Sequence, residues 1–242
     1  MDGAEARPAL RFDGGVTLIG GGAADRETFE AARARAPRVV AADGGANRLR
    51  DWGLGADAVI GDMDSVVDLP GWSARAETRV VPLAEQDSTD LEKCLYAVDA
   101  GYFLGVGFLG RRFDHTLAAL HALLRYPGKR LLLIGEEDVV FLAPQRWRAS
   151  LAPGARVSFY PIRPTRGLGS SGLEWPIDGL DFAAGGRIGT SNRATVAAVE
   201  ARFDGAGVAA MVERRFLDAA LASLAEGGDE AGFTEPSPEK DQ

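Results

Sequence analysis

The amino-acid sequence predicts an α/β fold: an N-terminal parallel-sheet α/β domain, followed by a smaller C-terminal antiparallel β-domain. Two observations lead to this prediction. Up to about Pro144, short apolar runs alternate with amphipathic segments, and strands that alternate with helices form parallel sheets. After Pro144, glycine and proline become frequent and long apolar helices disappear. We therefore expect an α/β domain over residues 12–145 and a β-rich domain over residues 146–225.

The elements of the first domain follow from apolar runs and their stop signals. Each expected strand is a short apolar run, and each expected helix is longer and amphipathic. Thr89 and Glu92 have the spacing of a capping box, and Asp114 is a natural N-cap for the last helix. In chain order we expect strands over 16–19, 38–42, 58–60, 79–82, 102–107 and 130–134, and helices over 25–36, 47–52, 89–100 and 115–125.

The second domain reads as short strands separated by turn residues. We expect strands over 156–160, 185–190, 195–203 and 208–213, and a closing helix over 215–225. Asp204 and Gly205, with Gly207, form a turn signal between the last two strands. The remaining segment, 226–242, is rich in glycine, proline and acidic residues and poor in core-forming residues. We expect this acidic tail to be disordered.

Composition excludes several functional classes. The chain has 242 residues, of which 46% are hydrophobic and 26% charged, as in ordinary soluble globular proteins. Its net charge is −8 and it has no basic stripe, so we expect no nucleic-acid partner. No apolar stretch reaches bilayer length, so we expect no membrane association. Cys94 is the only cysteine and residues 1–11 lack an apolar signal region, which favours a cytoplasmic protein.

Aspartates follow successive strands of the expected parallel sheet or begin the next helix. The carboxyl ends of parallel strands lie at one edge of a sheet, and ligands bind in the crevice there. We therefore expect six carboxylates to converge on one cleft, namely Asp43, Asp62, Asp64, Asp87, Asp90 and Asp114.

Such a cluster requires a cation. At 4 Å and an effective dielectric constant of 20, each like-charged pair costs roughly 4 kcal/mol. Mg²⁺ is the natural candidate, because it prefers carboxylate, phosphate and water oxygens. Lys93 and Arg112 would add positive charge for phosphate oxygens. The glycines at 20–22, 44–45 and 110 would let backbone amides approach a polyphosphate.

Each motif also has a purely structural interpretation. A single aspartate after a strand is commonly a helix cap, which applies to Asp87 and Asp114. The Asp-Gly-Gly run at 43–45 can be a turn, and residues 62–64 can be a solvated loop. Cys94 lies within an expected helix and is interpreted as a core residue. The coincidence of acidic residues at successive strand ends favours a functional site.

These segments together resemble the thiamine pyrophosphokinase family. The matching runs stand in the family's order over about residues 16–213: Asp-Gly-Gly-Ala at 43–46, Gly-Asp-Met-Asp-Ser at 61–65, Asp-Ser-Thr-Asp with a following lysine at 87–93, Gly-Arg-Arg-Phe-Asp-His at 110–115, Ser-Gly-Leu-Glu-Trp-Pro at 171–176 and Gly-Thr-Ser-Asn at 189–192. The main departure is Arg111, where the family has glycine. If that position requires a positive φ, arginine is strained there.

The resemblance implies Mg²⁺-dependent transfer of a pyrophosphoryl group from ATP to the hydroxyl of thiamine, with AMP leaving. It implies a homodimer with active sites at the subunit interface. Trp175 would stack on the cationic thiazolium ring, although it could also be a core or edge aromatic residue. The implied catalytic residues are Asp90, Lys93, Arg112 and Asp114; the ATP-binding residues are Gly21, Asp43, Gly44, Gly45, Asn47, Asp64, Gly110, Arg112 and His115; the thiamine-binding residues are Gln86, Trp175, Ser191 and Asn192; the metal ligands are Asp43, Asp62, Asp64, Asp87 and Asp90.

Two other functions stay open at this point. Gly105, Gly107 and Gly110 fit a dinucleotide-binding G-x-G-x-x-G pattern, but the acidic residue expected about 20 positions later is missing. A non-catalytic nucleotide or thiamine sensor is the second alternative, although a pure binder would not need several metal carboxylates. No Walker A sequence is present, which excludes a P-loop kinase.

Overall fold

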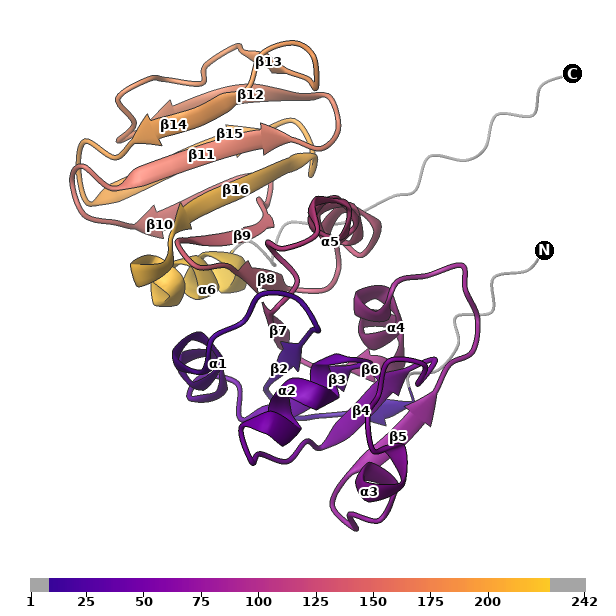
Figure 1. The fold of residues 1–242 in the computed structure, drawn as a ribbon. Helices are drawn as coiled ribbons and strands as arrows, with labels where there is room; N and C mark the ends of the chain where they lie inside the picture. The colour runs from indigo at the N-terminus through magenta and orange to yellow at the C-terminus, as the bar shows by residue number, and fades with distance from the viewer. Residues whose placement is uncertain (1–8, 227–242) are drawn as a thin grey trace, which may run out of the picture.

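A ten-stranded mixed sheet runs through the protein in the computed structural model, which describes residues 9–226 (Figure 1). Six strands pair in parallel, and the other four continue the sheet in antiparallel register. In spatial order the strands are β14 (Gly189–Arg193), β11 (Arg156–Pro161), β16 (Val208–Glu213), β9 (Asp138–Leu142), β8 (Leu131–Ile134), β7 (Tyr102–Val106), β2 (Gly15–Ile19), β3 (Arg38–Ala42), β4 (Ala58–Gly61) and β5 (Arg79–Pro82).

A second, four-stranded sheet is antiparallel throughout. Its strands, in order, are β10 (Arg146–Ser150), β15 (Ala198–Phe203), β12 (Thr165–Ser171) and β13 (Asp181–Phe182). A short parallel pair joins β1 (Leu10–Arg11) to β6 (Val98–Asp99). The expected combination of a parallel α/β part and a smaller antiparallel β part is therefore confirmed. Because β9 pairs with β16, one sheet spans both expected domains, and the domain bounds 12–145 and 146–225 stay a prediction.

Helices cover both faces of the parallel strands (Figure 1). Neighbouring strand residues point to opposite faces, so Leu18 and Ile19 belong to different core clusters. Phe29 and Leu49 pack with the cluster of Ile19, and Cys94 is buried in the cluster of Leu18, as expected for a core residue. The helices are α1 (Arg26–Arg33), α2 (Gly45–Asp51), α3 (Leu69–Ser73), α4 (Asp90–Ala97), α5 (Phe113–Arg125) and α6 (Leu217–Glu226), with a 3₁₀ turn at Arg214–Phe216.

The smaller sheet packs on the antiparallel half of the large sheet. Aromatic side chains fill the space between the two sheets, with ring centroids 5.6 Å apart for Trp147 and Phe159 and 5.4 Å apart for Phe159 and Phe203. Trp147 also donates its indole N–H to Ser223 on α6, at 3.1 Å. This aromatic core fixes the β-rich part against the end of the α/β part.

The structure corrects three local predictions. Helix α5 begins at Phe113 with Arg112 as N-cap, so Asp114 lies in the first turn and is not the cap. The strand expected over 185–190 begins only at Gly189, because Gly185 has a φ of 78° and belongs to a turn. The turn near Asp204 does not close a hairpin: β15 pairs with β10 and β12, whereas β16 pairs with β11 and β9. A turn signal indicates where the chain reverses and does not specify which strand it then meets.

The capping box is confirmed. The Thr89 amide donates to the Glu92 carboxylate at 2.9 Å, and the Glu92 amide donates to the Thr89 hydroxyl at 3.3 Å. No helix within residues 9–226 combines the length and hydrophobicity that a membrane span needs. The predicted disordered tail, 226–242, lies outside the described residues except for Glu226, which ends α6.

Candidate active site

Three carboxylates meet where β3 and β4 end. Asp43 directly follows β3, and Asp62 and Asp64 follow β4, which is its parallel neighbour. One oxygen from each of the three carboxylates lies within 4.8 Å of the others. The left-handed backbone at Asp43 (φ 42°) and Met63 (φ 69°) lets these tight turns form. The sequence prediction of converging carboxylates is thus fulfilled for these three residues.

Two glycines make this approach possible. A Cβ added to Gly61 would lie 2.6 Å from the Cβ of Asp43, so a side chain would separate β4 from the acidic turn. A Cβ added to Gly45 would lie 1.9 Å from the carbonyl oxygen of Ile19, where α2 begins against the end of β2. Glycine is therefore required at both positions by close backbone approach.

The electrostatics of the cluster favour a bound cation. Asp43 is 2% exposed, and its Oδ1 is a buried polar atom without a hydrogen-bond partner. Burial, with the nearby charges of Asp62 and Asp64, raises the pKa of Asp43. A buried carboxylate oxygen beside two further carboxylates is costly unless a cation binds there. An all-oxygen donor set of this kind suits a hard divalent ion such as Mg²⁺.

Lys93 provides a positive charge at the border of the cluster. Its side chain is 2% exposed, and its Nζ lies 3.6 Å from Asp62 Oδ2 and 3.6 Å from Asp90 Oδ1. Burial, together with the charge of Asp43, raises the pKa of Asp90. The N-terminus of α4 thus brings Asp90 and Lys93 to the acidic turn, as expected from the spacing of the motif.

Gln86 contacts the cluster directly. Its Nε2 donates to Asp62 Oδ2 at 2.8 Å. Hydrogen bonds from Gln86 and from the Asp64 amide lower the pKa of Asp62. Gln86 was expected at the thiamine, and the structure places its amide against an aspartate of the acidic group. The carboxylate of Asp87, by contrast, is not a member of the three-carboxylate group found within residues 9–226.

Glu85, which was not expected from the sequence, holds the 85–88 loop. Its carboxylate accepts the amide protons of Asp87 at 2.9 Å and Ser88 at 3.1 Å, the Tyr96 hydroxyl at 2.8 Å and the Ser88 hydroxyl. These contacts fix the loop that carries Gln86. The only available signal was an acidic residue three positions before a serine, which is too common to stand out.

Asn47 supports the second acidic turn. Its Nδ2 donates to the Ser65 carbonyl at 2.7 Å, and its Oδ1 accepts the Val67 amide at 2.8 Å. Ser65 in turn donates its hydroxyl to Asp64 at 2.8 Å. Asn47, expected near ATP, therefore holds the loop that follows Asp64 through hydrogen bonds to its backbone. It supports the acidic site by fixing this loop.

Arg112 and Asp114 form an exposed pair at the start of α5. The Arg112 guanidinium donates to both Asp114 oxygens, at 3.1 Å and 2.5 Å. His115, the next residue, is also exposed. The acidic cluster found within residues 9–226 does not include Asp114. Arg112 and Asp114 therefore lie at the protein surface, and the Arg112 guanidinium binds the Asp114 carboxylate.

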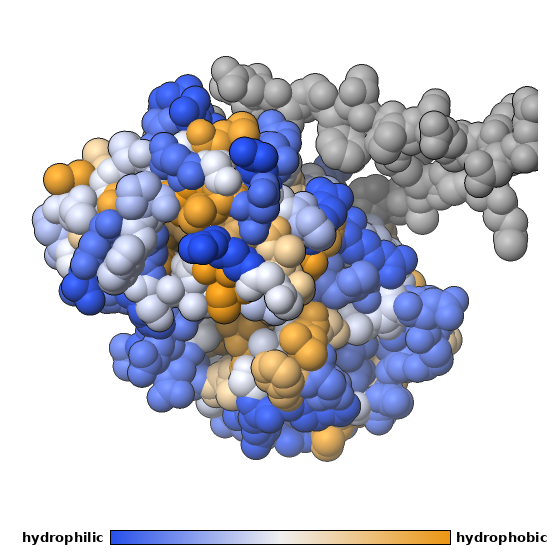
Figure 2. Space-filling model, turned by 90° about the horizontal axis from the view of Figure 1, so that it is seen from above, coloured by the Kyte–Doolittle hydropathy of each residue, from blue (hydrophilic) through white to orange (hydrophobic). Residues whose placement is uncertain are grey.

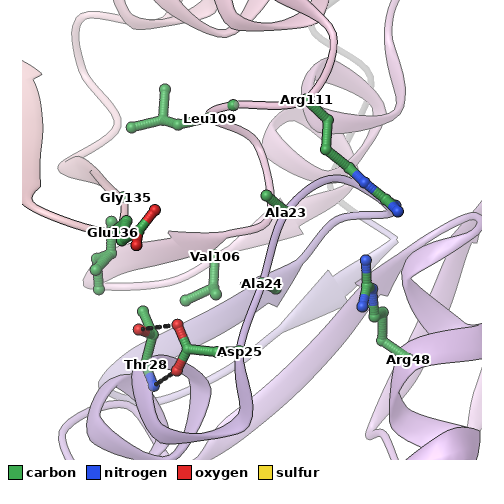
Figure 3. Close-up of a pocket in the computed structure, with 12 residues that line it drawn as sticks. Ala23, Ala24, Asp25, Thr28, Arg48, Val106, Leu109, Arg111, Gly135 and Glu136 are labelled. Carbon is green, nitrogen blue, oxygen red and sulfur yellow. Dashed lines mark hydrogen bonds between the residues drawn. The ribbon is translucent and has the colours of Figure 1, made fainter.

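A pocket of about 430 Å³ opens at the same edge of the sheet (Figure 3). It is bounded by the loop after β2, by α2, by the turn after β7 and by the end of β8. Gly21, in the first of these loops, lies beside Gly44, because a Cβ on Gly21 would be 3.6 Å from the Gly44 carbonyl carbon. The pocket therefore adjoins the turn that carries Asp43. Its lining residues are Ala23, Ala24, Asp25, Thr28, Arg48, Val106, Leu109, Gly110, Arg111, Ile134, Gly135 and Glu136.

The residues expected to bind thiamine in the β-rich part lie together. The Trp175 amide donates to Asn192 Oδ1 at 3.2 Å, and Asn192 Nδ2 donates to the Trp175 carbonyl at 2.6 Å. Ser191 has a φ of 62° and precedes the buried Asn192 on β14. The Trp175 side chain is 52% exposed, so it is not a core residue. Hydrophobic residues gather in a band between hydrophilic ones on the face seen in Figure 2.

Two family descriptions match the chain. "Thiamin pyrophosphokinase, catalytic domain" matches residues 29–133, and "Thiamin pyrophosphokinase, vitamin B1 binding domain" matches residues 148–205. Thiamine pyrophosphokinase 1 of Arabidopsis thaliana is 31% identical, with 63% of this chain and 69% of the relative covered. The chain belongs to the thiamine pyrophosphokinase family.

Solved structures support the same fold. The crystal structure of yeast thiamin pyrophosphokinase has a TM-score of 0.72 at 17% identity, covering 92% of this chain and 96% of that one. Thiamin pyrophosphokinase from Geobacillus thermodenitrificans has a TM-score of 0.68 at 21% identity, covering 82% and 96%. In this family the glycine pattern at 105–110 needs no dinucleotide interpretation: the Gly107 carbonyl accepts the Gly22 amide at 2.9 Å, which packs two loops at the pocket.

Arg111, where the family resemblance leads us to expect glycine, has a φ of 55°. Because this φ is positive, the arginine backbone is strained at this position. Gly110, immediately before it, has a φ of 80°. The loop thus keeps a left-handed conformation while carrying an arginine side chain.

Proposed function

We propose that this protein is a transferase, thiamine diphosphokinase, that moves the pyrophosphoryl group of ATP to the hydroxyl of thiamine and releases AMP. Family membership supports the reaction. The single structural observation that carries the proposal is the group of three carboxylates at the ends of β3 and β4, beside a pocket of about 430 Å³. Polyphosphate transfer needs charge neutralisation and positioning: a cation held by the three carboxylates would supply the first, and the pocket would supply the second.

The pocket supports binding of the nucleotide. Val106, Ala23 and Leu109 offer apolar surface for a base, and glycine-rich turns allow close approach of phosphates. The pocket adjoins the acidic turn through Gly21 and Gly44. A triphosphate that lies from the pocket toward Asp43 would bring its β-phosphorus to the carboxylates. Gly110 lines the pocket, Gly45 and Asn47 lie on α2, which also contributes Arg48 to the pocket, and His115 lies on α5.

Mg²⁺ fits the oxygen-only cluster, where Asp43, Asp62 and Asp64 would hold it. Asp90 is linked to this group through Lys93, and we propose that Asp90 and Asp87 contact the ion or its water shell. When bound, Mg²⁺ supplies neutralisation of the phosphate charge. The chain's own residues then position the reactants. Lys93 keeps a positive charge beside Asp62 and Asp90, and Gln86 orients Asp62.

Arg112 can exchange its contact with Asp114 for phosphate oxygens. Both side chains are more than half exposed, at 67% and 63%, so solvent screens their ion pair and it is easily exchanged. A polyphosphate offers the same planar pair of oxygens with more negative charge. Asp114 would thus hold the arginine in an extended, ready conformation until the nucleotide arrives.

Thiamine binding rests on the β-rich part and on a second subunit. Trp175 is half exposed, and Asn192 holds its backbone from both sides. A cation over an indole ring gains up to about 2 kcal/mol when desolvated. We propose a homodimer in which Trp175, Ser191 and Asn192 of one subunit complete the site that holds the carboxylates and Gln86 of the other. We also propose a cytoplasmic location, on the grounds of the single, buried Cys94.

AMP formation from Mg-ATP with and without thiamine tests the proposal. We expect thiamine-dependent AMP in equal amount to thiamine diphosphate. ATP-dependent reduction of a nicotinamide cofactor would instead favour the oxidoreductase alternative. Tight binding of either substrate without any AMP would favour the sensor alternative.

A further inference from the structure

The strained residue Arg111 also lines the pocket at the sheet edge. A non-glycine residue with positive φ costs conformational energy, and such outliers cluster at binding sites. Its side chain projects from the loop between β7 and α5 away from Leu109 and toward Arg48, at one end of the pocket (Figure 3). The residue with the strained backbone is thus also one that lines the pocket.

A second arginine faces it. Arg48, from α2, points toward Arg111 from the opposite side of the pocket mouth (Figure 3). One Arg48 nitrogen donates to the Gly22 carbonyl at 2.9 Å, which anchors the side chain but leaves most of its donors free. Neither arginine takes part in the ion pairs formed within residues 9–226.

The acidic residues of the pocket do not neutralise this pair. Asp25 accepts the Thr28 amide at 2.7 Å and the Thr28 hydroxyl at 2.8 Å, which engages both of its oxygens. Glu136 and Asp25 lie at the other end of the pocket from the two arginines (Figure 3). The pocket therefore has a cationic end, an apolar middle and an acidic end. Two facing guanidinium groups without a carboxylate favour an anion between them.

We propose that Arg111 and Arg48 grip the polyphosphate of the bound nucleotide from opposite sides, and that Arg111 makes the protein select nucleotides by their number of phosphates. This inference rests on the proposed function in one respect, namely that the pocket holds the nucleotide. Arginine binds two phosphate oxygens in a plane. The side chain therefore adds a contact that glycine at this position cannot make.

Three variants of Arg111 and one control variant separate the effect of the side-chain charge on binding from the effect of the strained backbone. Arg111→Gln removes the charge and keeps the strained backbone, Arg111→Gly removes both, and Arg111→Lys keeps the charge without the planar donors. Arg130→Gln is the matched control, because Arg130 is exposed and directly precedes β8, at the opposite end of the strand from the pocket. Dissociation constants for ATP, ADP, AMP and inorganic tripolyphosphate are measured by calorimetry with Mg²⁺ at two salt concentrations.

We expect Arg111→Gln and Arg111→Gly to weaken ATP and tripolyphosphate binding about tenfold or more, since hydrogen bonds to charged groups are worth about one decade or more. AMP binding should change less than about twofold. The loss of ATP affinity in Arg111→Lys should lie between those of the wild type and Arg111→Gln. Arg130→Gln should bind ATP as the wild type does. Arg111→Gly should melt at the same temperature as the wild type or higher, because glycine relieves the strained φ.

ATP affinity within twofold of the wild type in both charge-removing variants would overturn the inference. So would equal losses for ATP and AMP, or an equal loss in Arg130→Gln. The proposed function is measured separately, as thiamine-dependent AMP formation by the same samples. A wild type that makes AMP, with variants that bind ATP normally, refutes the role of Arg111 alone. A wild type that makes none refutes the proposed reaction, and the binding constants still decide the role of Arg111.

Discussion

The ammonium nitrogen of Lys93 lies 3.6 Å from Oδ2 of Asp62, and the same oxygen accepts the Gln86 amide at 2.8 Å. Two donors from different elements thus fix one oxygen of a single carboxylate. The other oxygen accepts the Asp64 amide at 3.3 Å. Asp62 is therefore the residue through which the α4 N-terminus, the 85–88 loop and the acidic turn after β4 are joined.

Asp62→Asn should strongly reduce turnover while the protein stays folded. The change removes one charge from the metal-binding group and weakens the attraction for Lys93. Loss of one preorganised electrostatic contact costs about 2.7–4 kcal/mol in the transition state, which corresponds to about 100- to 1,000-fold in kcat. Steady-state AMP formation at saturating Mg²⁺ measures this loss in kcat. Asp57→Asn is the control, since Asp57 pairs with Arg38 at the other end of the strands. Near-normal kcat in the Asp62 variant would remove it from the metal site.

Asp43→Asn should stabilise the metal-free protein. The buried, unpartnered Oδ1 costs about 1–3 kcal/mol, and an asparagine amide can donate to the neighbouring carboxylates. Because the folded-state pKa of Asp43 is raised, the folded protein holds this proton more tightly than the unfolded chain. Stability without divalent ions therefore falls as pH rises from the ordinary aspartate range through the raised pKa.

Thermal melts in EDTA across this pH range test the Asp43 prediction. The wild type should melt at decreasing temperature as pH rises, and the Asp43→Asn variant should show a flatter dependence. Mg²⁺ should raise the melting temperature of the wild type more than that of the variant, because ligands stabilise by binding the folded state. An identical Mg²⁺ response in both proteins would contradict the metal assignment of Asp43.

Glu85→Gln should lower activity and flatten the acid limb of the stability profile. Hydrogen bonds from the Ser88 side chain, then from the Tyr96 hydroxyl, lower the pKa of Glu85 from 4.5 to about 2. A depressed folded-state pKa adds stability that is present above about 4.5 and is lost as pH falls toward 2. Glutamine cannot accept the same set of donors, so the loop carrying Gln86 should loosen at the pH values where Glu85 is ionised.

Urea unfolding between pH 3 and 7, beside kcat at pH 7, measures the effect of Glu85→Gln. Tyr96→Phe is the matched control: it removes one donor to Glu85 and leaves the contacts of Ser88 and Asp87. We expect it to cost less activity than Glu85→Gln. A Glu85→Gln protein with wild-type kcat would show that the loop does not depend on this carboxylate.

Trp175→Ala should raise the KM for thiamine while the KM for ATP stays nearly unchanged. A stacked, partly desolvated cation is worth up to about 2 kcal/mol over an aromatic ring, or about 30-fold in affinity. Leu168→Ala is the matched control, because Leu168 is also 52% exposed in the β-rich part. An unchanged thiamine KM in a folded Trp175 variant would remove this residue from the site.

Mixed dimers test whether two chains share the site. Trp175→Ala and Asp62→Asn subunits are each expected to be defective, but a heterodimer would contain one site with both residues intact. Mixing the two should therefore restore part of the activity. Verified heterodimers that stay as inactive as the parents would indicate that each site is built within one chain.

Much of the α/β part was predictable because its signals are local. The buried runs that became β2, β3, β4, β7 and β8 are short, apolar and bounded by glycine or aspartate. The capping box at Thr89 is readable from two residues. Convergence of Asp43 with Asp62 and Asp64 followed from the rule that parallel strands share their carboxyl edge.

The β-rich part was less predictable, because its strands depend on distant partners. Strands β10 and β12 were not expected: β10 is only five residues long and includes two arginines, and β12 contains two glycines within seven residues. Their partner β15 contributes Val199, Ala201 and Phe203 to the core between the sheets. β-propensity of such segments depends on the surface against which they pack, which the sequence alone does not show.

The sequence by itself determined the order of elements, the acidic motifs at strand ends and the family resemblance, because these depend on residues close in the chain. Only the tertiary structure decided which of those residues meet. It joined β3 to β4 and so placed Asp43 beside Asp62, and it assigned Gln86 and the unforeseen Glu85 to the support of that carboxylate. It also turned Arg111 toward Arg48. Such relations arise from backbone pairing and packing across long stretches of chain, where loop-closure entropy and burial, and not local propensity, select the partners.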